Sequence, residues 1–303
     1  MRAWAIIFLL LLSALSEIFL GRVFSPDIIF FRVLRLILGF SAGFGLSVVG
    51  AVLQRVYRNP IADGYILGIS GGAVLGVALS ELFKLNLPLY LPSLLFSLPV
   101  SAIIIFLSSR VEPWILPVIG VGLGTFFSSL AVMFFILAGI ESSRTLYALW
   151  GSLGRFFSPS DLPILLFILI STLSLSLVLF LKNRDIDVMA LGELEALCLG
   201  YDPKRITVFS TVISSLLVSI ITSYVGIIGF VGIMAPHILG VFGIREGFRF
   251  YLFSGIMGAS LVLLADSFGR LIFGIDPPVG VIMGIMGAPF LVYLLLRKVN
   301  STL

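Results

Sequence analysis

The sequence predicts an all-α polytopic membrane protein with about ten transmembrane helices, and two observations support that prediction. First, 59% of the 303 residues are hydrophobic, only 11% are charged, and the mean hydropathy is +1.20, which is far from the composition of a soluble domain. Second, the charged residues divide the chain into uncharged intervals close to the roughly 20 residues that cross a bilayer core as a helix. We therefore expect residues 1–303 to form a single transmembrane domain.

The spans are expected to lie between the charged residues. The first interval resembles a signal peptide, but Glu17 interrupts its end and it lacks a small-residue cleavage site, so we expect it to be retained as a span. The interval 206–244 is long enough for two helices, with a break at 226–232. In order, the expected spans occupy 3–20, 36–54, 64–80, 85–109, 113–140, 162–181, 206–244, 250–265 and 277–296.

The basic residues indicate how the chain is oriented in the membrane. An even number of spans puts both termini on one side. Twelve Lys and Arg residues fall on that side and seven on the other. Because basic residues concentrate in cytoplasmic loops, we expect both termini in the cytoplasm. The net charge of +4 is spread over short loops on both faces, so it gives no case for a nucleic-acid partner.

A polar segment at 58–72 interrupts two long apolar runs with the residues RNPIADGYILGISGG. Pro60 removes a backbone donor and disfavours helical angles at Asn59, and four glycines allow backbones to approach closely. Lipid offers no partner for freed backbone groups, so irregular backbone is tolerated only inside protein or beside water. The segment therefore indicates either a pathway wall or a tight helix packing site, and the residues alone leave both open.

The connection 182–205 differs from every other loop because it has helical periodicity of its own. Gly200 suits a helix stop, and Asp202 followed by Pro203 suits the cap and first residue of the next helix. We expect two short helices joined at a glycine, either lying on lipid or docking a cytoplasmic partner. The acidic residues of the loop disfavour anionic lipid and favour docking. The residues expected on one apolar face are Ile186, Met189, Leu194 and Leu197.

Motifs for ATP and metal chemistry are missing from the sequence. No GxxxxGKS or GxxxxGKT motif occurs, so any ATP would have to be bound by a partner. The single histidine, His237, and the single cysteine, Cys198, provide no metal-ligand cluster. We expect His237 to be a neutral imidazole bonded to a backbone group and Cys198 to be a small packing residue. Four GxxxG pairs indicate close helix packing; they are Gly39/Gly43, Gly72/Gly76, Gly120/Gly124 and Gly280/Gly284.

Several stretches carry a resemblance to a known family. They are VVGAVLQRVYRNPIADGYILGISGGAVLG at 48–76, GIIGFVGIMAPHILG at 226–240, LLADSFGRLIFGIDPPVGVIMGIMGAPFLVYLLLRK at 263–298, and WGSL at 150–153. On these residues the sequence resembles the FecCD-type permease subunits of ABC importers, which take up iron-siderophores, haem, cobalamin and related chelates.

The resemblance implies a type II ABC importer permease in the cytoplasmic membrane of a prokaryote. Such a subunit pairs with a second copy, or with a homologous permease, around a central pathway. Two cytoplasmic ATPase subunits, which use ATP and Mg²⁺, drive alternating access, and an external substrate-binding protein docks on the outer face. The permease itself would be no enzyme and would hold no cofactor. Ferric siderophore is the first expectation for the substrate, with haem or cobalamin as alternatives.

The same resemblance assigns roles to particular residues. Local alternatives exist for the arginines, because interfacial snorkelling would also explain them and Asp266 lies one helical turn before Arg270. The implied binding-protein docking residues are Arg32, Arg35 and Arg270; the pathway and gate residues are Asn59, Pro60, Asp63, Leu67, Gly68, Ser70, Ser128 and Ser129; and the ATPase-coupling residues are Leu191, Gly192, Glu193, Ala196, Leu197 and Gly200.

Two other classes of function stay open on the residues alone. One is a stand-alone ion-coupled secondary transporter, which would normally need more ionisable residues within its spans. The other is an intramembrane enzyme that uses His237 and Asp266. It would need a nucleophile and a base within hydrogen-bond reach, and no such arrangement is readable at helical spacing.

Overall fold

The computed structural model describes residues 2–19, 26–139, 150–154, 161–273 and 276–300, and all regular structure in these ranges is helical. Six helices are long and apolar enough to cross a membrane, and four shorter helices are also apolar. Within the described ranges, this agrees with the expected number of about ten. The protein is thus an all-helical membrane protein.

Within the described residues, the chain forms two short 3₁₀ helices and twelve α-helices. Two short 3₁₀ helices, η1 (Tyr65–Leu67) and η2 (Pro113–Ile115), precede α3 and α5. The α-helices are α1 (Arg2–Phe19), α2 (Pro26–Val56), α3 (Ile69–Leu82), α4 (Tyr90–Ser108), α5 (Leu116–Leu137), α7 (Leu162–Leu181), α8 (Asn183–Met189), α9 (Glu193–Cys198), α10 (Pro203–Val225), α11 (Val231–Val241), α12 (Gly247–Phe273) and α13 (Val279–Asn300).

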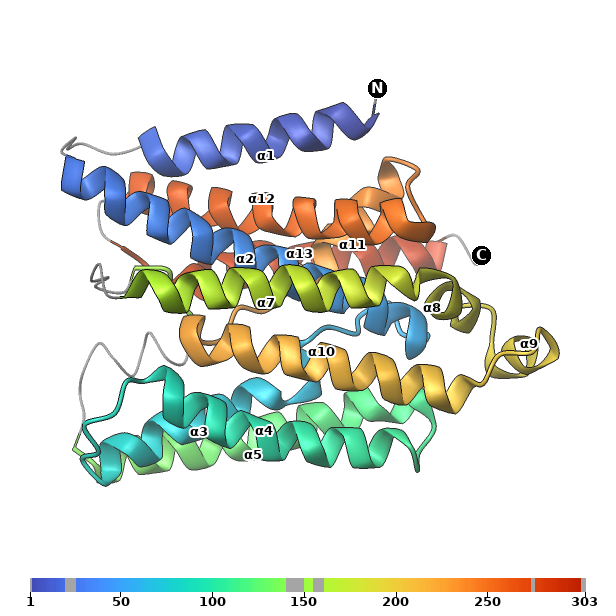
Figure 1. The fold of residues 1–303 in the computed structure, drawn as a ribbon, viewed down its shortest axis with the longest axis horizontal. Helices are drawn as coiled ribbons and strands as arrows, with labels where there is room; N and C mark the ends of the chain where they lie inside the picture. Colours follow the sequence, from blue (N-terminus) through green and yellow to red (C-terminus); the bar gives the residue numbers. More distant parts are fainter. Residues whose placement is uncertain (1, 20–25, 140–149, 155–160, 274–275, 301–303) are drawn as a thin grey trace.

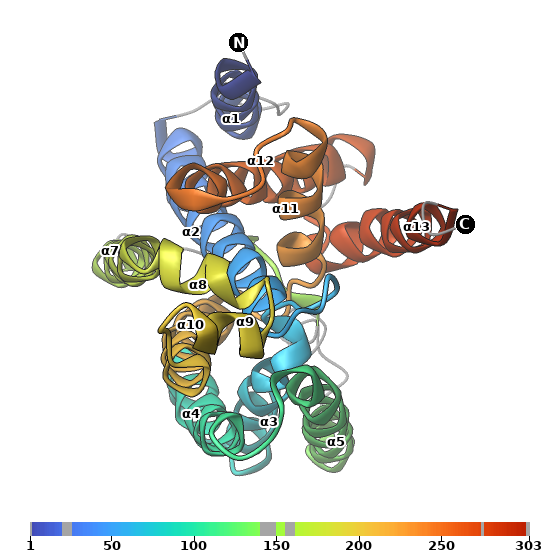
Figure 2. The same cartoon turned by 90° about the vertical axis from the view of Figure 1, so that its right-hand side faces the viewer.

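The long helices lie roughly along one direction, and the short helices α8 and α9 protrude at one end (Figure 1). We call this the α8–α9 end of the bundle. Helix α1 begins and α13 ends on the same side as α8 and α9. Viewed from that end, α2 lies near the middle, while α1, α5, α7 and α13 lie at the periphery (Figure 2). The arrangement agrees with an even number of crossings.

Glycine contacts hold α2 against α12. A Cβ atom on Gly43 would lie 2.4 Å from the carbonyl oxygen of Gly258 and 2.6 Å from Cα of Ala259. Any larger residue at position 43 would therefore push the backbones of α2 and α12 apart. The Ser47 hydroxyl donates a hydrogen bond of 2.6 Å to the Ser254 carbonyl. Small residues therefore set the distance between these two helices, as they commonly do in membranes.

Two helices are longer than the charge pattern predicted. We expected a span to begin at Leu36, but α2 begins at Pro26. We expected another to end at Ala265, but α12 continues to Phe273. Charged residues inside both helices pair with one another, as described below, and so they do not end the helices.

The predicted break at 226–232 is confirmed, and the protruding loop is confirmed in part. Helix α10 ends before Gly226, which has φ +83°, and α11 starts at Val231. The Asp202 side chain caps α10 by accepting from the N–H of Arg205. The single apolar face predicted for α8 and α9 is wrong, because the chain turns at Gly192, which has φ +136°. Leu194 and Leu197 are exposed, whereas Ile186 and Met189 on α8 are buried.

Candidate functional site

A cluster of arginines and carboxylates lies where α1, α2 and α12 meet, away from the α8–α9 end. The Arg35 guanidinium donates to both carboxylate oxygens of Asp266, at 2.6 and 2.7 Å, and to Asp276 at 2.8 Å. The side chains of Arg35 and Asp266 are 9% and 1% exposed. Bidentate pairs of this kind are among the strongest hydrogen-bonded contacts.

Glu17 is the second acidic centre of this cluster. Its side chain is fully buried and lies 2.6 Å from Arg270 Nη2, and the Ser267 hydroxyl donates to it at 2.8 Å. Arg32 donates to the carbonyl of Ile18 at 2.6 Å. Glu17 was missed as a site residue. The signal was its charge inside an apolar helix, which is costly in lipid and therefore calls for a partner.

The three arginines predicted to dock a binding protein therefore lie at one end of the bundle and are already engaged within the chain. The local alternative is also present, because Arg270 Nε lies 3.4 Å from Asp266. Binding-protein docking stays a prediction. It would require incoming carboxylates to compete with Glu17, Asp266 and Asp276 or to extend the cluster. We call these three carboxylates and the three arginines the arginine–carboxylate cluster.

The polar segment folds into a turn followed by η1. Arg58 leaves the helical conformation with φ +50°, and the Asn59 side chain accepts a hydrogen bond of 3.1 Å from the N–H of Ile61. Asn59 and Pro60 are half-buried, whereas Leu67 and Ser70 are buried. Proline, asparagine and glycine thus form the turn by the local chemistry expected of them.

Gly68 shows that the polar segment is a tight packing site. Its φ of +74° favours glycine, and a Cβ atom there would lie 2.3 Å from the carbonyl oxygen of Gly120 on α5. A Cβ on Gly120 would in turn lie 2.1 Å from the carbonyl oxygen of Ile66. The packing alternative is therefore realised, while the pathway role of this segment stays a prediction.

Asp63 caps α11 from outside that helix. It is buried and accepts a hydrogen bond of 2.5 Å from the N–H of Gly64, with further backbone hydrogen bonds from Phe230 and Tyr65. Burial raises the pKa of this carboxyl to about 7, and the backbone hydrogen bonds offset part of the effect of burial. An acidic group at a helix N-terminus is stabilised by the unpaired N–H groups and the helix dipole.

Residues of α2 join the same contact. Gln54 Nε2 donates to the carbonyl of Gly232 at 2.8 Å. A Cβ atom on Gly50 would lie 2.2 Å from that same oxygen. The turn after α2 and the start of α11 are thereby held together by Asp63, Gln54 and two glycines. Both segments of irregular backbone are therefore packed against other parts of the protein at this contact.

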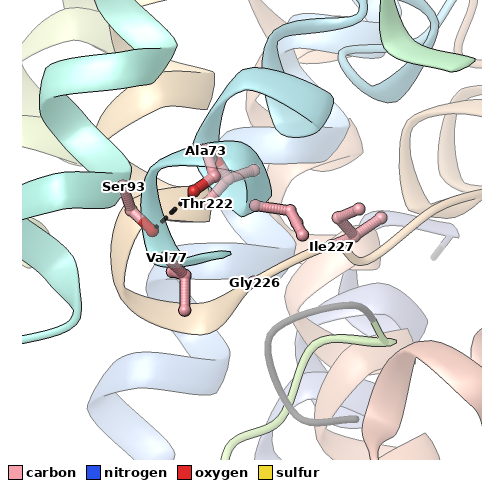
Figure 3. Close-up of a pocket in the computed structure, with 7 residues that line it drawn as sticks. Ala73, Val77, Ser93, Thr222, Gly226 and Ile227 are labelled. Atoms are coloured by element: carbon pink, nitrogen blue, oxygen red, sulfur yellow. Dashed lines mark hydrogen bonds between the residues drawn. The ribbon is translucent and has the colours of Figure 1, made fainter. Parts of the chain in front are cut away.

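A small cavity beside the 226–230 break lies between α3, α4 and α10 (Figure 3). Ser93 and Thr222 face it, and the Ser93 hydroxyl donates to the carbonyl of Ala73 at 3.0 Å. Its volume of about 10 Å³ is near the minimum for one water molecule. This cavity cannot hold a bulky chelate. Ser128 and Ser129, the candidate wall residues on α5, do not line it; they are half-buried and exposed, respectively.

The predicted ATPase-coupling residues lie on and beside α9. Glu193 pairs with Arg58 of the polar segment at 3.1 Å, so the loop touches the candidate gate. Cys198 is exposed, and the prediction that it packs inside the protein is wrong. Of the remaining coupling residues, those that are exposed are Leu191, Leu197 and Gly200, and those that are buried are Gly192 and Ala196.

His237 contacts the backbone of its own helix. Its Nδ1 lies 2.7 Å from the carbonyl oxygen of Ile233, which confirms the predicted bond to a backbone group. The residues that the structure describes contain no group of three His, Cys, Asp or Glu side chains placed to hold a metal ion.

These features are those of a polytopic membrane protein. A half-length helix preceded by irregular backbone, such as α11, also occurs in membrane transporters. The model of the FecCD transport family matches residues 4–297. The chain belongs to the FecCD transport family.

Individual relatives agree with this assignment. A Helicobacter pylori protein named "Probable iron chelatin transport system permease protein" is 34% identical over 274 residues, covering 88% of this chain and 81% of the relative. The Escherichia coli Fe(3+) dicitrate transport system permease protein FecD is 33% identical, with coverage of 88% and 84%. A solved structure described as "An inward-facing conformation of a putative metal-chelate type ABC transporter" shares the fold, with a TM-score of 0.86, 24% identity and 98% coverage of both chains. The chain is accordingly an ABC importer permease subunit.

Proposed function

We propose that this permease subunit imports a ferric siderophore or a related metal chelate across the cytoplasmic membrane. The observation that carries the substrate class is the set of relatives, whose names specify iron chelatin, Fe(3+) dicitrate and, for a Halobacterium salinarum relative 30% identical over 273 residues, cobalamin. All three are bulky metal chelates. Haem stays an alternative because a hemin permease of Yersinia pestis is 29% identical.

A second permease copy would complete the pathway. The cavity described above holds about one water, so a pathway for a chelate is better placed between two chains. The polar segment lies on the side of the bundle between α5 and α13 (Figure 2). Helix α5 is largely exposed there, including Ser129. A partner copy on this side would place at the interface those predicted gate residues that are half-buried or exposed, which are Asn59, Pro60, Ser128 and Ser129.

Two cytoplasmic ATPases would bind ATP and Mg²⁺ and dock on the protruding helices, with both termini of the permease on the same side. Helix α9 exposes Leu194 by 74% and Leu197 by 55%, and Glu193 and Glu195 stand beside them. Exposed leucines with a charged rim suit a protein partner better than a lipid surface. An external binding protein would dock at the opposite end, near the arginine–carboxylate cluster.

The geometry suggests how ATP would open the pathway. Movement of α9 would pull on Arg58 through Glu193. Arg58 begins the polar segment, which is packed against α5 at Gly68 and against α11 at Asp63. ATP-driven closure of the partner subunits would thereby shift the segment and switch access between the two sides. The permease would use the energy of ATP hydrolysis by its partners to switch access, and it would hydrolyse no ATP itself.

Replacing Leu194 and Leu197 together with serine should reduce co-purification of the ATPase at least tenfold. Each buried leucine contributes about 1.5–3 kcal/mol, and about 1.4 kcal/mol is a tenfold change in binding. The loss is measured as the amount of ATPase retained per permease after purification in detergent. In the unchanged protein, bound ATPase should also slow maleimide labelling of the single cysteine, Cys198.

The matched control is Leu87→Ser, because Leu87 is also exposed, at 41%, but lies in the loop between α3 and α4. This variant should retain ATPase as the unchanged protein does. Full ATPase retention in the double α9 variant, with Cys198 labelled equally fast with and without ATPase, would show that the ATPase docks on a surface other than α9.

A further inference from the structure

Asp187 on α8 joins separate parts of the chain at the α8–α9 end of the bundle. Its Oδ1 lies 3.2 Å from Arg55 Nη1 and accepts a hydrogen bond of 2.6 Å from the Tyr251 hydroxyl. Its Oδ2 accepts a hydrogen bond of 2.7 Å from the N–H of Gly247. Arg55 lies in the last turn of α2, and Gly247 and Tyr251 lie at the start of α12. One carboxylate therefore holds α8 against the ends of both helices.

Arg55 extends this contact to the connection between α11 and α12. Its guanidinium also donates to the carbonyl of Arg245 and lies 4.9 Å from the centroid of the Phe250 ring. The side chains of Arg55 and Asp187 are each 19% exposed. Because the pair is partly buried, its attraction is screened less than that of a fully exposed pair.

Helices α2 and α12 are joined along their length and near their other ends. Gly43 lies against the backbone of Gly258 midway along the two helices. Near their other ends, Arg35 holds Asp266 with two hydrogen bonds. A displacement applied to α2 and α12 at the Asp187 contact would therefore move them as a pair, up to the arginine–carboxylate cluster.

We propose that Asp187 is a positioning residue that transmits movement of α8 and α9 to the α2–α12 pair, and through it to the arginine–carboxylate cluster. The proposal rests on the proposed function, because the movement comes from docked ATPases. It adds a route distinct from the contact between Glu193 and Arg58. Asp187 contacts residues of both α2 and α12 directly, whereas Glu193 contacts Arg58, two residues past the end of α2.

Asp187→Asn and Tyr251→Phe test this route in the full complex of permease, ATPase and binding protein in liposomes. Asp187→Asn removes the ion pair, and Tyr251→Phe removes one hydrogen bond. With ferric dicitrate, haemin and cobalamin as transport probes, we expect Asp187→Asn to assemble, to keep basal ATP hydrolysis within about twofold, and to lose at least about tenfold in probe imported per ATP. Tyr251→Phe should lose about threefold. Asp187→Asn loses more because it removes the charge that Arg55 and Tyr251 both contact, whereas Tyr251→Phe removes one hydrogen bond and leaves the ion pair with Arg55 in place.

The control is Asp185→Asn on the same helix, because Asp185 pairs with Lys182 in an i,i+3 surface contact of 3.2 Å that stays within one helical turn. It should import as much probe per ATP as the unchanged protein. Unchanged import per ATP in both test variants would refute the route through Asp187. If Asp187→Asn fails to assemble, Tyr251→Phe decides: a loss at unchanged basal hydrolysis supports the route, and no loss refutes it. An unchanged protein that binds no ATPase would instead refute the proposed function, and the inference with it.

Discussion

Arg35→Ala should destabilise the folded permease by about 3–5 kcal/mol, because it removes the bidentate partner of the buried Asp266 and leaves Arg270 to pair with both Asp266 and Glu17. The guanidinium of Arg35 contacts Asp266 and Asp276 at 2.6–2.8 Å and lies 3.5 Å from Glu17. Asp266 and Glu17 are 1% and 0% exposed, so water cannot replace the lost partner. Thermal unfolding of the purified permease in detergent, without any partner protein, measures the change.

Arg205→Ala is the matched control for this prediction. Arg205 pairs with Asp202 at 3.0 Å, but its side chain is 89% exposed, so its loss should cost less than about 1 kcal/mol. If Arg35→Ala unfolds at the temperature of the unchanged protein, the cluster does not hold the fold. The arginine would then be free for the docking role that the family resemblance implies.

Gly50→Ala should destabilise the permease by about 1–3 kcal/mol or more, because the added methyl group would meet main-chain atoms. Its Cβ would lie 2.2 Å from the carbonyl oxygen of Gly232 and 2.4 Å from Cα of that residue. Backbone cannot rotate away as a side chain can. The separation of α2 from α11 that results would also strain the Gln54 hydrogen bond to the same carbonyl. Thermal unfolding and expression level both report this change.

Gly240→Ala provides the comparison on α11 itself, since nothing lies within 4 Å of a Cβ atom there. Alanine favours helix over glycine by up to about 1 kcal/mol, so this variant should be neutral or slightly more stable. Equal stability of Gly50→Ala and Gly240→Ala would show that the close approach of α2 and α11 carries no constraint.

The fold could be predicted from the sequence because apolar intervals in a membrane protein report helices directly. The true ends of α2 and α12 could not be predicted, because Arg35 and Asp266 lie inside these helices. The sequence shows that a charge in a membrane helix is costly, but it does not show the oppositely charged partner that offsets the cost. Asp266 lies on α12, far along the chain from Arg35, and pairs with it only after folding. The broken apolar face at Gly192 was missed for a different reason, since periodicity assumes one continuous helix.

The site was predicted unevenly for related reasons. The turn at 58–72 could be recognised from proline and glycine, whose backbone preferences are local. Its contacts with α5 and α11 could not be read from the sequence. Asp187, Gln54 and Glu17 act through residues distant in the chain, and none belongs to a recognisable spacing. The family resemblance supplied roles for particular positions, but it did not reveal the ion pairs of Arg35 and Arg270 or the hydrogen bond of Arg32 to the Ile18 carbonyl.

The most direct test of the account is transport by the permease in liposomes with and without its ATPase, its binding protein and ATP. Ferric dicitrate, haemin and cobalamin serve as probes. The account predicts a stable permease–ATPase complex, hydrolysis that the binding protein changes, and import of at least one metal chelate that requires ATP. A permease that purifies alone and carries the chelate without ATP, driven by an ion gradient, would contradict it and support a secondary transporter.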